Sequence, residues 1–123
     1  MTFEDQANLI NLAESLPAAL RKSLTRFAEI HAKITALEEA GITEATTYYR
    51  QAGTKRYLYL IHPTKDGTRQ REYIGPDPEK QAAALARLDR WEQYQQLTAK
   101  ARDLGSSISY FEANLRQLLR NLK

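Results

Sequence analysis

The chain has 123 residues, 42% hydrophobic and 27% charged, with only 5 Gly and 4 Pro, which excludes a disordered tail and predicts a single domain over residues 1–123. It has no cysteine, which excludes disulfide bonds and thiolate zinc sites and makes the cytoplasm the expected location. The net charge of +3 is unevenly spread, because residues 46–75 hold six basic and two acidic side chains while residues 1–45 hold four and seven.

Residues 1–40 are predicted to form an N-terminal helical arm. The first residues include Glu4 and Asp5 and lead into no continuous apolar run, so neither a secretory signal nor a membrane span is expected. Pro17 predicts a break near Ser15, because a proline inside a helix removes a hydrogen bond and clashes with the preceding turn. Apolar residues at three- and four-residue steps indicate one buried stripe, namely Ile10, Leu16, Leu20, Leu24, Phe27, Ile30, Ile34 and Leu37. Gly41 is the expected C-terminal stop.

Residues 45–75 change to a period of two and are predicted to form a basic β-sheet. Three strands are expected at residues 45–51, 55–62 and 68–74, with turns at 52–54 and 65–67. A three-residue loop ending in Gly67 would place Tyr59 opposite Tyr73 and Leu58 opposite Ile74. A two-residue turn would instead move every side chain of the third strand to the other face of the sheet.

With the three-residue loop, the sheet has two chemically different faces. The apolar face collects Tyr49, Leu58, Leu60 and Ile74, and it is suited to pack on the helix ends. The other face collects four cations and four phenol rings, which are Tyr48, Arg50, Lys55, Tyr57, Tyr59, Arg69, Arg71 and Tyr73. Five of the seven tyrosines of the chain lie in this one segment.

Residues 78–122 are predicted to form a C-terminal helical arm that starts at Pro78 behind an Asp77 N-cap. Its apolar residues follow alternating steps of four and three, as in a coiled-coil seam, at Leu97, Ala101, Leu104, Ile108, Phe111, Leu115, Leu118 and Leu122. Ser109 and Glu112 could form a capping box that restarts a helix after Gly105. The seam keeps its phase across Gly105, which favours one continuous helix.

The two arms would span about 57 Å and 67 Å at 1.5 Å per residue. Helices of similar length with one apolar stripe each are expected to pair antiparallel, with Leu37 near Ala82, Phe27 near Trp91 and Ile10 near Ile108. The predicted fold class is therefore a mostly helical α+β protein, a coiled-coil-like antiparallel helix pair with a small three-stranded antiparallel sheet inserted at one end.

Cations among aromatic rings are typical of nucleic-acid-binding surfaces. Arg and Lys neutralise phosphates, while exposed rings stack on bases, and an arginine such as Arg69 or Arg71 could instead read guanine in the major groove. The predicted contact residues are Tyr48, Arg50, Lys55, Arg56, Tyr57, Tyr59, Arg69, Arg71 and Tyr73, with DNA expected as the ligand in preference to RNA. The alternative is a purely structural sheet, since tyrosine favours strands and edge cations prevent aggregation.

A second hypothesis is an assembly or adaptor protein. In it the seam formed by Leu97, Leu104, Ile108, Phe111, Leu115, Leu118 and Leu122 binds a protein partner or a second copy in a homodimer.

Catalysis is not expected. His31 and His62 have no Cys or close carboxylate cluster that would make a metal site, and the adjacent Glu38 and Glu39 point in different directions on a helix. No cofactor, metal or membrane partner is predicted.

Thr47-Tyr48-Tyr49, Tyr57-Leu58-Tyr59-Leu60 and the run from Arg71 to Asp77 resemble a family of small uncharacterised prokaryotic proteins, some of them linked to mobile elements. The resemblance covers about residues 47–97 and implies a tyrosine-rich β-hairpin between helices. Some members carry cysteines before the hairpin, and this chain has none, so no metal role is carried over. The three-stranded pattern also looks like the DNA-arm-binding sheets of phage integrases, by analogy of fold alone.

Overall fold

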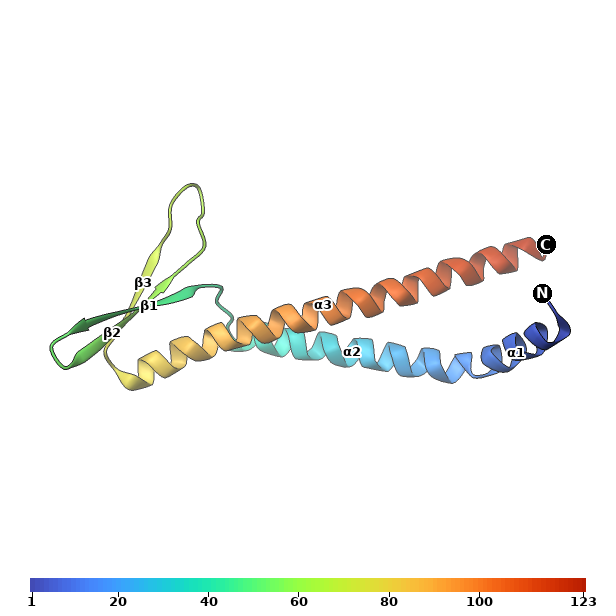
Figure 1. Cartoon of the computed structure of the whole chain (residues 1–123), viewed down its shortest axis with the longest axis horizontal. Helices are drawn as coiled ribbons and strands as arrows, with labels where there is room; N and C mark the ends of the chain where they lie inside the picture. The colour runs from blue at the N-terminus through green and yellow to red at the C-terminus, as the bar shows by residue number, and fades with distance from the viewer. The chain divides into compact units, whose positions relative to one another are not determined.

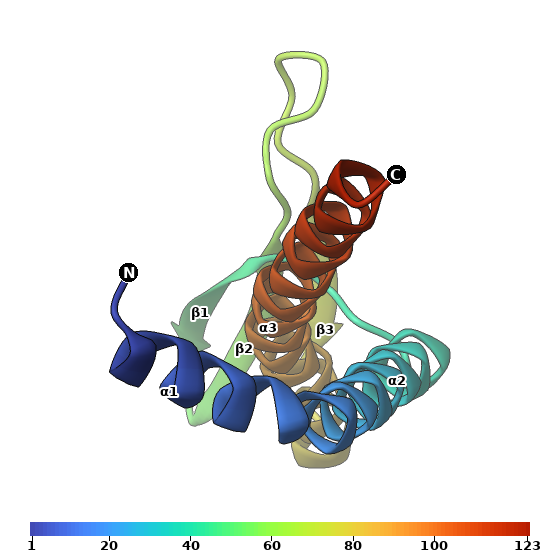
Figure 2. The same ribbon diagram turned by 90° about the vertical axis from the view of Figure 1, so that its right-hand side faces the viewer.

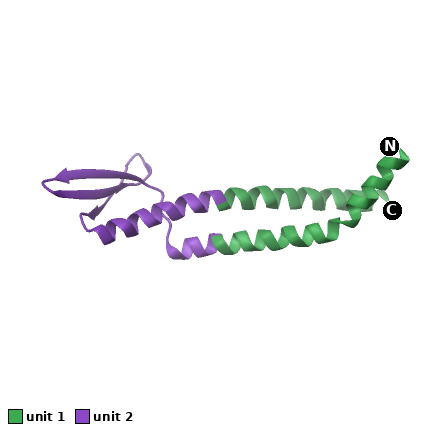
Figure 3. Ribbon diagram, turned by 60° about the horizontal axis from the view of Figure 1, so that its bottom comes forward, with its two compact units in different colours: residues 1–33, 97–123 green, residues 34–96 purple.

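A computed structural model describes all residues, 1–123, and shows a mostly helical α+β protein (Figure 1). The elements in chain order are α1 (Phe3–Glu14), α2 (Leu16–Ala40), β1 (Thr46–Ala52), β2 (Lys55–Ile61), β3 (Arg71–Gly75) and α3 (Pro78–Asn121). They form two compact units (Figure 3), which we name the helical unit, residues 1–33 and 97–123, and the sheet unit, residues 34–96. The predicted fold class is confirmed.

The break in the N-terminal arm lies at Ser15, as predicted. A capping box between Thr2 and Asp5 starts α1, and the Ser15 hydroxyl donates to the carbonyl of Leu12 at 2.7 Å where α1 ends. Pro17 then falls in the first turn of α2, where its missing N–H costs no helical hydrogen bond. The chain changes direction at this point, which the two orthogonal views show (Figures 1 and 2).

Within the helical unit, α2 packs against the C-terminal part of α3. A Cβ placed on Gly105 would lie 3.1 Å from Cε2 of Phe27, so the Phe27 ring covers the glycine. Ile30 and Ala101 are both buried. The helix α3 runs unbroken through Gly105, which confirms the continuous helix predicted from the seam.

Two of the three predicted pairs of neighbours across the helix pair are wrong. Phe27 meets Gly105 and not Trp91, and 14 residues of helix separate those positions by about 21 Å. In the sheet unit, Arg90 Nε donates to the carbonyl of Gly41 at 2.6 Å, so α2 ends level with Arg90 and Leu37 is not beside Ala82. The reason is that the first turns of α3 cover the sheet, an apolar surface that the length argument ignored.

The sheet is antiparallel in the order β1-β2-β3. Strand β1 pairs with β2 from Thr46↔Ile61 to Ala52↔Lys55, around a turn at Gly53 and Thr54. The third strand begins at Arg71, three residues later than predicted, because the preceding residues form an arm with a single bridge, Lys65↔Thr68.

The turn in this arm differs from the prediction. Lys65 and Thr68 exchange both backbone hydrogen bonds, and Asp66 and Gly67 have φ values of 53° and 76°. Two consecutive residues with positive φ make a two-residue turn of the kind that suits hairpins, not the predicted three-residue loop.

β2 and β3 nevertheless present the predicted side chains on each face, because a second irregularity in the arm corrects the one-residue shift that the shorter turn introduces. The N–H of His62 donates to the carbonyl of Gln70. Between this pair and the Lys65–Thr68 pair, the first side of the arm has two residues, Pro63 and Thr64, and the second side has only Arg69. The register thereby returns to Tyr59↔Tyr73, as predicted. At the end of β3, Leu58 pairs with Gly75 and not with Ile74 as predicted. Ile74 is the extra residue of a β-bulge.

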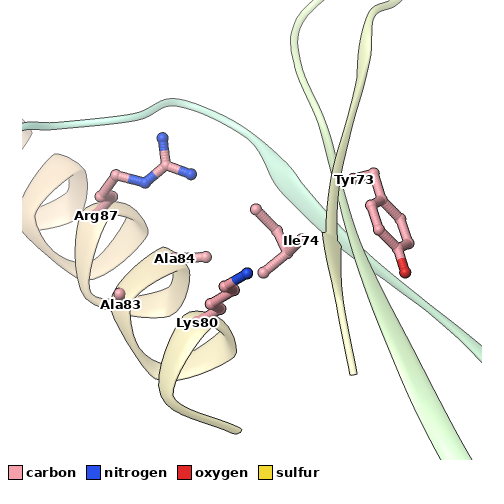
Figure 4. Close-up of a pocket in the computed structure, with 6 residues that line it drawn as sticks. All are labelled: Tyr73, Ile74, Lys80, Ala83, Ala84 and Arg87. Carbon is pink, nitrogen blue, oxygen red and sulfur yellow. The ribbon is translucent and has the colours of Figure 1, made fainter. Parts of the chain in front are cut away.

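The core of the sheet unit lies between the sheet and α3. Leu58 and Leu60 are fully buried against Ala84, with Ala45, Tyr49, Ile74 and Leu88 partly buried around them. Burying each leucine stabilises the fold by roughly 1.5–3 kcal/mol. The helix side of the sheet is the apolar face that alternation predicts, and Figure 4 shows Ile74 directed toward α3 and Tyr73 on the opposite side of β3.

Candidate nucleic-acid interface

The surface of the sheet that faces away from α3 is basic and aromatic. We name it the tyrosine face, and its members are Tyr48, Arg50, Lys55, Tyr57, Tyr59, Arg71 and Tyr73, which the strand register places on one side. The same register adds Thr46, Ala52 and Ile61, and no residue of this face is acidic. Alternation along the three strands therefore separates three cations from Glu72, the single carboxylate of the strands.

Three tyrosines form a ladder across the middle of the tyrosine face. Tyr48 and Tyr59 have ring centroids 6.1 Å apart at 53°, and Tyr59 and Tyr73 are 5.4 Å apart at 60°. Tilted pairs of this kind stabilise one another by about 0.5–1.5 kcal/mol. The outer rings stay open to solvent, with Tyr48 45% and Tyr73 59% exposed, while Tyr59 is half-buried between them.

Cations flank the ladder on both sides. The guanidinium of Arg71, on the Ile61 side, lies 5.7 Å from the Tyr48 ring centroid. Arg50 pairs with Tyr57 on the other side, where it lines a shallow depression of about 180 Å³ together with Ala52, Tyr57, Tyr59 and Tyr73. Neither these arginines nor Lys55 forms an ion pair, so their charges are available to an anion.

The carboxylate of β3 is held on the helix side. Glu72 accepts a 2.7 Å hydrogen bond from Arg87 and lies 3.0 Å from Nε2 of His62, and Arg87 also donates to the hydroxyl of Thr43 at 3.3 Å. The hydrogen bond from Arg87 lowers the pKa of Glu72 below its usual range, against the opposing effect of partial burial. This network fastens β3 to α3 and removes a negative charge from the tyrosine face.

Gly75 and Gln81 position the end of the ladder. Gly75 has φ +99°, and a Cβ there would lie 3.2 Å from the Tyr73 hydroxyl oxygen and 3.5 Å from Cε1, so the ring of Tyr73 packs over the glycine. Gln81 donates to the carbonyls of Arg56 and Gly75 at 2.9 and 2.8 Å, which ties β2 and β3 to the start of α3. Sequence reasoning missed both residues, although the Gly75-Pro76 pair before a helix marks a special turn.

Two of the predicted contact residues lie off the tyrosine face. Arg56 alternates to the helix side, where its guanidinium lies 3.7 Å from the centroid of the Tyr49 ring. Arg69 lies in the arm between β2 and β3, donates to the hydroxyl of Thr64 at 3.1 Å and lines a pocket with Trp91. The remaining seven predicted residues are brought together.

The predicted coiled-coil seam is covered over only part of its length. Leu97, Leu104, Ile108 and Phe111 are half-buried, whereas Leu115, Leu118 and Leu122 are exposed, the last of them by 77%. The apolar residues of α1, among them Phe3 and Leu12, are also exposed. The last turns of α3 and the whole of α1 therefore present uncovered apolar side chains.

Comparisons with protein-family models, curated proteins and solved structures found no match to the chain. None of the helices combines the length and the apolar character needed to cross a membrane.

Proposed function

We propose that the chain is a non-enzymatic nucleic-acid-binding module, with DNA as the preferred ligand over RNA, and that the tyrosine face is its contact surface. One observation carries the proposal. Three cations without ion-pair partners share a carboxylate-free face with two exposed tyrosine rings. The single carboxylate of the three strands, Glu72, is held on the opposite side of the sheet by Arg87.

The two residue types supply different parts of the binding free energy. Arg50, Lys55 and Arg71 neutralise phosphates and release condensed counterions, which makes affinity fall linearly with the logarithm of the salt concentration. Exposed tyrosine rings add stacking that is tolerant of base sequence. The proposed module therefore binds with little sequence preference and with strong salt dependence.

The test removes the two arginines that flank the ladder. Replacing Arg50→Gln and Arg71→Gln together weakens binding and reduces the slope of log affinity against log salt by about 1.5–2, because two phosphate contacts are lost. Fluorescence anisotropy of a labelled oligonucleotide across a salt series measures both quantities.

The matched control changes net charge equally at another place. Arg21→Gln with Arg102→Gln also removes two charges, from exposed positions in the helical unit. The control retains the affinity and slope of the unmodified protein. Equal losses in the two double variants would show that net charge alone attracts the oligonucleotide, and the tyrosine face would lose its assigned role.

A second candidate function, self-association, is favoured by the uncovered apolar residues of the helical unit. α1 carries Glu4, Asp5 and Glu14 and no basic residue, whereas the C-terminal end of the chain carries Arg116, Arg120 and Lys123, of which Arg116 is paired with Glu112. Opposite charges beside bare apolar stripes suit a reciprocal contact, in which α1 of one copy covers the end of α3 in a second copy and the reverse holds by symmetry.

Light scattering coupled to size-exclusion chromatography tests this contact. The proposal expects a dimer that Leu12→Gln or Leu122→Gln converts to monomer, because each substitution places an amide in the apolar contact. Both leucines are exposed within one chain, so neither change disturbs a single copy. A monomer at every protein concentration would exclude the contact.

A further inference from the structure

We infer that the tyrosine face binds single-stranded nucleic acid and that its outer tyrosines, Tyr48 and Tyr73, stack on unpaired bases. This inference rests on the proposed function and names its substrate class. The alternative at the same surface is duplex DNA read in the major groove through arginine side chains.

The two outer rings of the ladder have exposed aromatic faces on which a base could stack. The ladder crosses all three strands, and its two outer rings are the exposed ones. An exposed ring gains most from a flat partner that covers its face. In a duplex the bases stack on one another and show only their edges in the grooves, whereas an unpaired base has a free face. The exposed rings of the tyrosine face therefore suit stacking with unpaired bases.

The second argument concerns where the arginines lie. Reading guanine requires an arginine free to reach base edges, yet Arg69 is hydrogen-bonded to Thr64 in the arm and Arg56 covers Tyr49 on the other face. Arg71 leans over the Tyr48 ring. The strand register places Arg71 two residues to one side of the ladder along β3 and Arg50 two residues to the other side along β1, which suits contact with a phosphate backbone while the bases lie on the rings.

The third argument is the spacing of charge along the strands. Arg71 lies at the level of Ile61 and Arg50 at the level of Tyr57, with the ladder at the level of Tyr59 between them. Four residues of extended strand separate the two charged levels by about 13 Å. A nucleic-acid strand that crosses the ladder therefore meets a cation before and after the stacking rings, as in the grooves of proteins that bind single-stranded nucleic acid.

Anisotropy with three labelled probes tests the inference. The probes are oligothymidylate of about 20 nucleotides, its duplex with oligoadenylate, and oligouridylate of the same length. At equal salt concentration, oligothymidylate binds at least about tenfold more tightly than the duplex. Tighter binding of oligouridylate than of oligothymidylate would retain single-strand binding and identify RNA as the ligand.

Substitutions in the ladder separate stacking from hydrogen bonding. Tyr73→Ala weakens single-strand binding roughly 5- to 150-fold, the range for loss of one stacked base, while Tyr73→Phe keeps the affinity because the ring remains. Tyr73→Leu keeps apolar bulk in the strand without an aromatic face, so it shows the same loss in a folded protein. Tyr110→Ala is the matched control, since Tyr110 is 73% exposed on α3 outside the sheet.

The outcomes distinguish this inference from the proposed function. Tighter binding of the duplex, still weakened by the double arginine substitution, would overturn the single-strand assignment and leave nucleic-acid binding intact. Unchanged affinity in Tyr73→Leu would also overturn it. Absence of salt-dependent binding to all three probes would remove both the inference and the function on which it rests.

Discussion

The two faces of the sheet are made by alternate residues of the same three strands, but they differ in how fully their groups are satisfied. On the helix side, Leu58 and Leu60 are fully buried and Glu72 is paired with Arg87. On the tyrosine face, Arg50 and Arg71 have no carboxylate partner and the outer rings face solvent. One face of the sheet therefore stabilises the fold, whereas the cations and rings of the other face remain available for contacts with another molecule.

The difference in stability contribution between the two faces can be tested by truncating one residue on each face. Leu60→Ala is expected to lower the free energy of unfolding by about 2–5 kcal/mol, because it removes fully buried methyl groups and leaves a cavity. Tyr48→Ala, on the other face, should cost less than about 1.5 kcal/mol, mostly the lost ring contact with Tyr59. Urea unfolding followed by the fluorescence of Trp91 measures both values. Equal costs would mean that the tyrosine face is structural.

Gly75 is the last residue of β3, and the ring of Tyr73 on the tyrosine face packs over it. Gly75→Ala is expected to destabilise the protein by about 1–3 kcal/mol, since its positive φ is strained for any other residue and its Cβ would meet the Tyr73 ring. Gly53→Ala is the control, because Gly53 also has positive φ but no atom within 4 Å of the added Cβ. Thermal unfolding should show the larger loss for Gly75, and a larger loss for Gly53 would contradict the packing of Tyr73.

The smallest expected effect concerns the paired carboxylate on the helix side. The pKa of Glu72 is lower in the folded chain than its usual value, so its ionised form stabilises the fold. That contribution is complete above about pH 4.3, the pKa of a free glutamate, and it is lost as pH falls through the folded-state pKa.

Glu72→Gln removes this dependence. The difference in unfolding free energy between the unmodified protein and the variant should shrink as the pH falls below about 4.3, from no more than about 1 kcal/mol at neutral pH, because the pair is partly exposed to solvent. Urea titrations at a series of pH values measure it. A difference that grows at low pH would reverse the assigned direction of the pKa shift.

Several features of the fold and of the site could be predicted from local sequence signals. Pro17 predicted the break at Ser15, Gly41 predicted the end of α2, and alternation placed Leu58 and Leu60 on the buried face. Each signal acts within a few residues, through a missing N–H, a left-handed backbone conformation or the two-residue period of a strand. The register survived a wrong turn assignment only because Pro63 and Thr64 add a compensating residue.

The other features depend on contacts between distant segments. No local signal turned Arg69 away from the tyrosine face or brought Arg87 to Glu72 across 15 residues. The pairing of α2 with α3 was also decided at this level, because Ala84 and its neighbours on α3 bury the sheet and leave only later turns for α2.

Local sequence signals thus predicted the helices, the first two strands and the faces of the residues within the strands, because backbone preferences and periodicity are local properties. Only the tertiary structure decided which cations remain unpaired and which apolar turns remain uncovered. Both depend on contacts between segments that lie far apart in the chain, such as those of Arg87 with Glu72 and of Phe27 with Gly105.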